Sequence, residues 1–137
     1  MDFDTKKLAG IFNTSLTATA IRLAEHGPLP TMLAYYSAER RVWFVRGSGV
    51  PEKLWPVNKP GKNTYAFDLF KGGTERELRG DVPAKAWFDH WCANQHSVYE
   101  HSLQTRFGDI LTLLWWKDEQ MLIDLEELRR KTGRAPL

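Results

Sequence analysis

The sequence ILTLLWW, residues 110–116, is the most apolar run in the chain, and the expected fold is built outward from it. A run this apolar belongs in the middle of a sheet rather than at its edge. The preceding segment, residues 97–105, is expected to pair with it as a hairpin. The turn falls at residues 106–109, where Gly-Asp is a favourable pair. These two segments predict the centre of an antiparallel sheet.

Two aromatic and β-branched segments, residues 31–37 and 41–46, are predicted to be further strands joined by a turn at 37–40. Apolar residues occur on both faces of each segment, so we expect both strands to be covered on both sides. Residues 74–80 are polar, which indicates an edge strand or a loop. The fold class predicted from these segments is α+β, with an antiparallel sheet of about five strands and flanking helices.

Three later segments have helical signals. Residues 64–71 are predicted to be a helix capped by Asn63, after a long Gly- and Pro-rich loop over residues 47–63. Residues 83–91 are predicted to be a short helix with its proline in the first turn. Residues 118–131 begin with acidic and end with basic side chains, which matches the helix dipole. The residues expected to face inward on this last helix are Met121, Leu125 and Leu128.

Residues 8–27 have the outline of two short helices joined by a turn at 13–15. Apolar residues share one face of the second helix, and Gly27 stands where a left-handed cap is favoured. Two interpretations stay open. The pair is either a helical cap on the sheet or a DNA-binding helix-turn-helix. The residues that would read DNA are Thr17, Thr19 and Arg22.

Composition narrows the class of protein. The chain has 137 residues, enough for one domain of residues 28–137 with the helical pair of residues 1–27 as an appendage. The net charge of the chain is +2, and that of the helical pair is zero. Electrostatics therefore do not favour nucleic acid as a partner. A single cysteine excludes an internal disulfide. No apolar run is long enough to cross a bilayer, so we expect a cytoplasmic protein without membrane contact.

Several motifs occur in an order that resembles a known family. The motifs are FNTSLTATAIRLA and GPLP near the N-terminus, VWFVRG after them, PAKAWF at residues 83–88, YEHS at 99–102 and LTLL at 111–114. This pattern is similar to the portion that follows the catalytic module in ImmA/IrrE-type zinc metallopeptidases. The resemblance implies a helix-turn-helix-like linker followed by a GAF-like sensor domain. It also implies a setting in bacterial or phage stress response, where family members cleave or control a repressor.

The catalytic signature of that family is absent. Zinc peptidases of this type use His-Glu-x-x-His, in which two histidines bind the metal and the glutamate is the general base. The chain's four histidines, His26, His90, His96 and His101, do not form it. We therefore expect a non-enzymatic sensor or interaction module that binds a small ligand, a regulator protein or a separate peptidase subunit. A DNA-binding regulator and a piece of a full metallopeptidase are the alternatives.

Two groups of residues are candidates for a metal site or a ligand-binding site. His90, Cys92, His96, Glu100 and His101 cluster in sequence, but their spacing is not that of a zinc site, so no metal and no cofactor are predicted. No phosphate-binding loop or nucleophile motif occurs either.

A ligand-binding region is predicted instead from aromatic side chains and one carboxylate that could anchor a polar ligand, although pairing of that carboxylate with an arginine is the alternative. These residues are Tyr35, Trp43, Trp55, Trp87 and Glu100. The lysines and arginines of the loop over residues 47–63 and its surroundings indicate either attraction of an acidic ligand or a solvated face.

Overall fold

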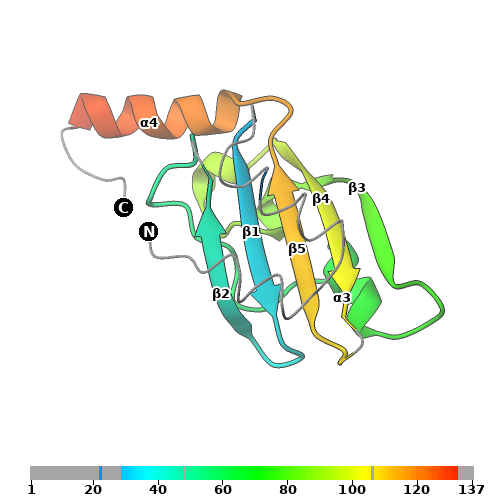
Figure 1. Ribbon diagram of the computed structural model, residues 1–137. Helices are drawn as coiled ribbons and strands as arrows, with labels where there is room; N and C mark the ends of the chain where they lie inside the picture. The colour runs from blue at the N-terminus through cyan, green and yellow to red at the C-terminus, as the bar shows by residue number, and fades with distance from the viewer. Residues whose placement is uncertain (1–21, 23–28, 48, 106, 133–137) are drawn as a thin grey trace.

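The computed structural model describes residues 22, 29–47, 49–105 and 107–132, and these form an α+β fold, as the sequence predicts. A five-stranded antiparallel sheet has the strand order β2-β1-β5-β4-β3 (Figure 1). The strands are β1 (Thr31–Tyr36), β2 (Arg41–Arg46), β3 (Glu77–Pro83), β4 (Ser97–Gln104) and β5 (Ile110–Trp115). The helices are α3 (Tyr65–Phe70) and α4 (Gln120–Thr132), with two 3-10 turns, η1 (Ala84–Ala86) and η2 (Trp91–Ala93).

The most apolar segment is the middle strand. β5 pairs with β1, where Leu33 lies opposite Leu113, and with β4, where Glu100 lies opposite Leu114. The predicted hairpin between β4 and β5 is confirmed, and Thr105 N–H donates to the Asp109 carbonyl at 2.8 Å to close it. A central position allows β5 to bury side chains on both faces, which is what its composition requires.

One face of the sheet forms the main core. Alternate residues of β1 and β5 point into it, because side chains of a strand alternate between faces. Trp87 and Trp116 are fully buried there, and both described helices contribute to the same cluster. The strand and helix residues that meet in this core include Met32, Ala34, Tyr36, Ile110, Leu114, Ala66, Leu69, Met121 and Leu125.

The second face of the sheet is also apolar. Leu33 is fully buried on it, and Leu111 and Leu113 are 3% and 4% exposed. Two aromatic pairs flank them, Tyr35 with Trp43 and Tyr99 with Trp115. The expectation of cover on both sides is therefore confirmed for β1. For β2 it is met in part: Val45 is 7% exposed and Phe44 packs against the main core on the other face, whereas Val42 is 47% exposed.

The predicted N-terminal pair lies outside the described residues, apart from Arg22. Arg22 is helical and its side chain is exposed. Thr17 and Thr19, the other two residues of the DNA-binding alternative, are among the residues that the structure does not describe. In the part of the chain that is described, no helix is both long enough and apolar enough to cross a membrane.

Three predicted helices begin or end differently in the structure. α3 is capped by Thr64, whose hydroxyl accepts from Phe67 N–H at 3.1 Å, and not by Asn63. α4 begins at Gln120, and its N-terminal amide donates to Asp118 at 3.0 Å. The helix predicted at residues 83–91 is wrong. Pro83 ends β3 in an extended conformation, and the chain then makes η1 and η2 with an extended His90 between them.

Candidate functional site

Glu100 is the most connected polar residue of the core. It lies on β4, is fully buried and accepts four hydrogen bonds. Its Oε1 accepts from Tyr65 N–H and from Trp87 Nε1–H, both at 3.0 Å. Its Oε2 accepts from Ala66 N–H at 2.8 Å and from the Ser102 hydroxyl at 2.6 Å. One carboxylate therefore holds the first turn of α3 and the residue that follows η1.

The surroundings of Glu100 shift its acidity. Burial raises the pKa of Glu100 above its ordinary value of 4.5, and the donors limit the rise because they stabilise the ionised form. All four donors are uncharged, so these bonds do not include the arginine partner that the sequence left open. The sequence marked Glu100 as notable, but its partners lie up to 35 residues away, and no local pattern reveals them.

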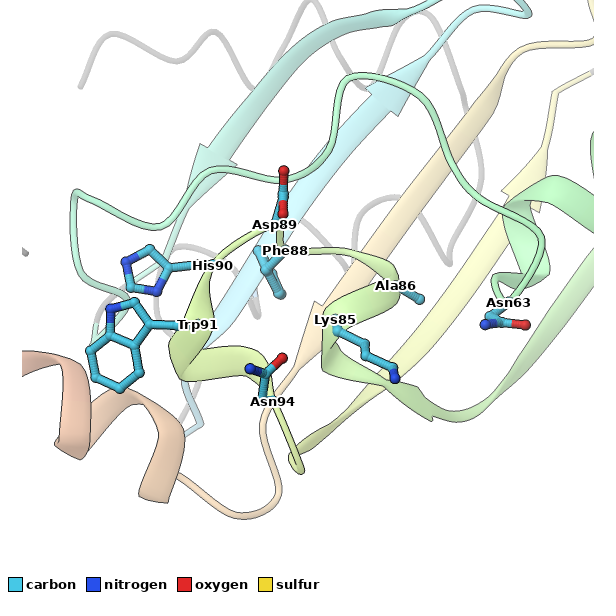
Figure 2. Close-up of a pocket in the computed structure, with 8 residues that line it drawn as sticks. All are labelled: Asn63, Lys85, Ala86, Phe88, Asp89, His90, Trp91 and Asn94. Atoms are coloured by element: carbon cyan, nitrogen blue, oxygen red, sulfur yellow. The ribbon is translucent and has the colours of Figure 1, made fainter. Parts of the chain in front are cut away.

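A cleft opens beside this network (Figure 2). It has a volume of about 500 Å³, and we call it the Asn63 cleft. Its lining residues come from the end of the long loop and from η1, η2 and the segment between them. They are Asn63, Lys85, Ala86, Phe88, Asp89, His90, Trp91 and Asn94. A second hollow of about 390 Å³ shares Asn63 and runs along Tyr65 and Pro83.

The Asn63 cleft presents polar and aromatic groups but no activated nucleophile. Trp91 is 48% exposed, and its ring centroid lies 5.6 Å from that of His90. His90 Nδ1 accepts from Cys92 N–H at 3.1 Å, so the neutral ring carries its proton on Nε2. Lys85 adds a cation and Asp89 a carboxylate. This combination favours binding of a small polar molecule over covalent chemistry.

Cys92 lies beneath the same segment and is not poised to react. Its side chain is buried, and burial raises the pKa of its thiol from 9.0 to about 11. A thiol needs to ionise before it becomes a nucleophile. Cys92 therefore acts as a small apolar side chain of the core at neutral pH.

The residues weighed as metal ligands point to different partners. His96 Nε2 lies 4.0 Å from Asp124 Oδ2, and His101 pairs with Glu77 on the second face of the sheet. His90 Nδ1 accepts the hydrogen bond from the backbone N–H of Cys92. Within the described residues, no group of three or more potential ligands is arranged to hold a metal ion.

The five residues predicted to bind a ligand are not brought into one pocket. Trp87 and Glu100 are in direct contact in the core. Tyr35 and Trp43 stack with ring centroids 5.5 Å apart on the second face, where the Tyr35 hydroxyl donates to Asp109. Trp55 is 57% exposed and packs on Phe44 from the long loop.

The residues that line the Asn63 cleft were largely missed from sequence. Lys85, Asp89 and Asn94 have no distinctive spacing, and the segment was expected to be a helix. The break at Asp89-His90, with an aspartate and a histidine before a tryptophan, was the available signal. Comparison of the chain with models of protein families, with curated proteins and with solved structures found no match.

Proposed function

We propose that the protein is a non-catalytic sensor that binds a small polar ligand in the Asn63 cleft and passes this state to a partner protein. The partner is a regulator of the repressor type or a separate peptidase subunit. The resemblance to the accessory portion of ImmA/IrrE-type peptidases supports this setting, and it supports a GAF-like identity for the sheet domain. The reaction itself, if the partner is a peptidase, belongs to the partner.

The observation that carries the proposal is that Glu100 bonds to residues that neighbour the cleft lining in the chain. Trp87 lies between the cleft residues Ala86 and Phe88, and its indole donates to Glu100. Tyr65, two residues after Asn63, donates its amide to the same carboxylate. A ligand that displaces either wall therefore perturbs one buried carboxylate. Electrostatic interactions of that group are strong because the core has a low dielectric constant. This linkage gives a bound molecule a route to the sheet.

The cleft residues define the chemistry of the ligand. Lys85 attracts an acidic group, Asp89 attracts a basic or hydrogen-bond-donating group, and the exposed face of Trp91 accepts a flat or apolar part. The Asn63 and Asn94 amides add donors and acceptors. A small amphoteric molecule with a planar portion satisfies these groups together.

The proposal includes the N-terminal pair as a cover for the second face of the sheet. Leu33 and Leu113 are buried there, while the buried residues of α3 and α4 belong to the opposite face. β1 begins at Thr31, so the N-terminal segment joins the sheet directly at this strand. Its predicted apolar stripe of Leu16, Ala20 and Leu23 is suited to such a surface.

A fragment screen by ¹H–¹⁵N NMR tests the ligand site. We expect the fragments that bind to be amphoteric and to shift the amides of residues 85–94 together with Asn63. Their affinity is expected to fall about tenfold or more in Trp91→Ala, because stacking on the indole is lost. Trp55→Ala is the matched control, since it removes another exposed tryptophan outside the cleft. Fragments that shift only other residues, or equal losses in both variants, would contradict the proposed site.

A further inference from the structure

Two arginines and two aromatic rings form a partly exposed cluster at the β2 edge, which we call the Arg41–Trp55 cluster. The guanidinium carbon of Arg41 lies 5.0 Å from the Phe44 ring centroid and 5.4 Å from that of Trp55. The corresponding distances for Arg46 are 4.8 and 5.2 Å. The two rings meet edge to face with centroids 5.0 Å apart. Both guanidinium groups therefore lie against the same aromatic pair.

The cluster is held rigidly by the loop that follows β2. Arg41 donates through Nη1 to the Pro56 carbonyl, and Arg46 donates through Nε to the Leu54 carbonyl at 2.9 Å. Arg46 Nη2 is buried and has no hydrogen-bond partner. The side chains are thus ordered before anything binds, which lowers the entropic cost of binding.

The charge around the cluster is unbalanced. Burial lowers the pKa of Arg46, Arg41 lowers it further through repulsion, and Glu52 acts in the opposite direction. Neighbouring basic residues in sequence are Arg40, Lys53, Lys59 and Lys62. Glu52 acts on Arg46 more strongly than Arg41 does, but residues 39–62 hold six basic and two acidic side chains, so the region keeps a positive charge that attracts an anionic group.

We propose that the Arg41–Trp55 cluster is the docking site for an acidic segment of a partner protein. The four residues of the cluster do not line either of the clefts described above. Tryptophan and arginine are the side chains that most often carry the binding energy of protein interfaces. Trp55 is 57% exposed, which leaves apolar surface beside the charges. The inference rests on the proposed function in one respect, namely that the protein has a protein partner.

The side chains of the cluster indicate the chemistry of the partner segment. Its carboxylates pair with the N–H groups of Arg41 and Arg46 that the loop carbonyls leave available, so the contact is mainly one of charge. A large apolar side chain among the carboxylates packs on Trp55. Single-stranded nucleic acid also combines anions with flat rings, and the experiment separates the two cases.

The test uses the full chain and a fluorescein-labelled peptide of about twelve residues in which glutamate alternates with leucine or phenylalanine. Fluorescence anisotropy is expected to show binding that weakens about tenfold or more in Trp55→Ala and in Arg41→Gln. Arg40→Gln removes the same charge at the adjacent residue, and Trp91→Ala removes an exposed tryptophan elsewhere. Both controls are expected to change the affinity less than about threefold, the scale of exposed charge effects.

A second measurement needs no variant. In the wild-type protein, the peptide is expected to shift the amides of residues 41–46 and 54–57 in ¹H–¹⁵N spectra, whereas cleft fragments shift residues 85–94. The two sets of signals distinguish failure of this inference from failure of the ligand cleft. Equal losses in Arg40→Gln and Arg41→Gln would reduce the effect to diffuse charge and overturn the proposal. So would absent peptide binding, or tighter Trp55-dependent binding of a single-stranded oligothymidylate.

Discussion

At the scale of single residues, Glu100 has the largest influence on the candidate site. A buried carboxylate is costly unless its oxygens are satisfied, and here each oxygen accepts two donors. The same four bonds hold the backbone of α3 and the indole of Trp87. Glu100 is therefore a structural anchor for both walls of the Asn63 cleft and not a free group that points into it.

Glu100→Gln tests this anchor. The amide nitrogen of glutamine cannot accept hydrogen bonds, so one oxygen position loses its partners and leaves Ala66 N–H or Tyr65 N–H unpaired in the core. At about pH 4.5, we expect the free energy of unfolding to fall by about 1–3 kcal/mol, measured by urea denaturation. A variant as stable as the wild type would show that the four bonds contribute little.

The difference in stability between the wild type and Glu100→Gln is expected to depend on pH. Because the pKa of Glu100 is raised in the folded state, its contribution to stability is largest below 4.5 and is lost as pH rises through the raised pKa. The stability advantage of the wild type over Glu100→Gln should therefore narrow from about pH 4.5 towards neutrality. Parallel curves for the two proteins over this range would contradict the raised pKa.

Cys92 gives a second residue-scale prediction. With the pKa of its thiol at about 11 instead of 9.0, the thiolate population at pH 7 is about a hundredfold smaller than that of an unperturbed cysteine. Alkylation by iodoacetamide, followed by mass spectrometry, is expected to be slower than for glutathione by at least that factor. Reaction at the rate of glutathione would show that the thiol is accessible and ionisable.

At the scale of elements, α3 depends on its surroundings. Six residues are too few for an isolated helix, so α3 is stabilised by its Thr64 cap, by Glu100 and by its contact with β3. Gly80 on β3 lies opposite Glu100 in the register of the two strands. A Cβ atom added at Gly80 would lie 2.5 Å from the Tyr65 hydroxyl, so the absence of a side chain admits the tyrosine ring.

Gly80→Ala is expected to lower the free energy of unfolding by about 1–3 kcal/mol, because the ring of Tyr65 has to move. The double variant with Tyr65→Phe removes the closest contact and should cost less than the sum of the single variants. Thermal and urea denaturation of the four proteins measures this coupling. Strict additivity would mean that Gly80 and Tyr65 do not constrain each other.

Elements were more predictable than the contacts between them. Residues 31–36 and 41–46 were predictable as strands from their aromatic and β-branched side chains, and residues 110–115 from their apolar composition. Residues 97–104 followed from the turn that joins them to this apolar run. The break at residues 87–90 was not predictable in this way, since Trp87, Phe88 and Trp91 have helical spacing. Tertiary contacts decide that segment: Trp87 Nε1–H bonds to Glu100, and Ala84 N–H bonds to the His96 carbonyl at 2.9 Å.

At the scale of the whole molecule, the described helices and 3-10 turns pack on a sheet that has two apolar faces. The described helices and both 3-10 turns contribute their buried residues to one face. The lining of the Asn63 cleft comes from the end of the long loop and from residues of η1, η2 and the segment between them. The fold class followed from periodicity, which is a local property. The site did not, because its residues come from separate segments that only the folded chain brings together.

The proposed cover of the second face has a direct test in the full chain. Leu16→Asp and Leu23→Asp place a charge on the stripe predicted to pack on Leu33 and Leu113, and we expect a loss of about 2–4 kcal/mol in stability. Thr19→Asp is the matched control on the predicted outer face and should have little effect. Urea denaturation followed by tryptophan fluorescence reports on the sheet. Unchanged stability in the leucine variants would refute the proposed cover.

The linkage of both cleft walls through Glu100 is tested most directly by an NMR pH titration of the wild-type protein. We expect the Trp87 indole N–H and the amides of Tyr65 and Ala66 to shift together, with one shared midpoint above pH 4.5. Three unrelated midpoints, or no titration of the Trp87 signal, would contradict it.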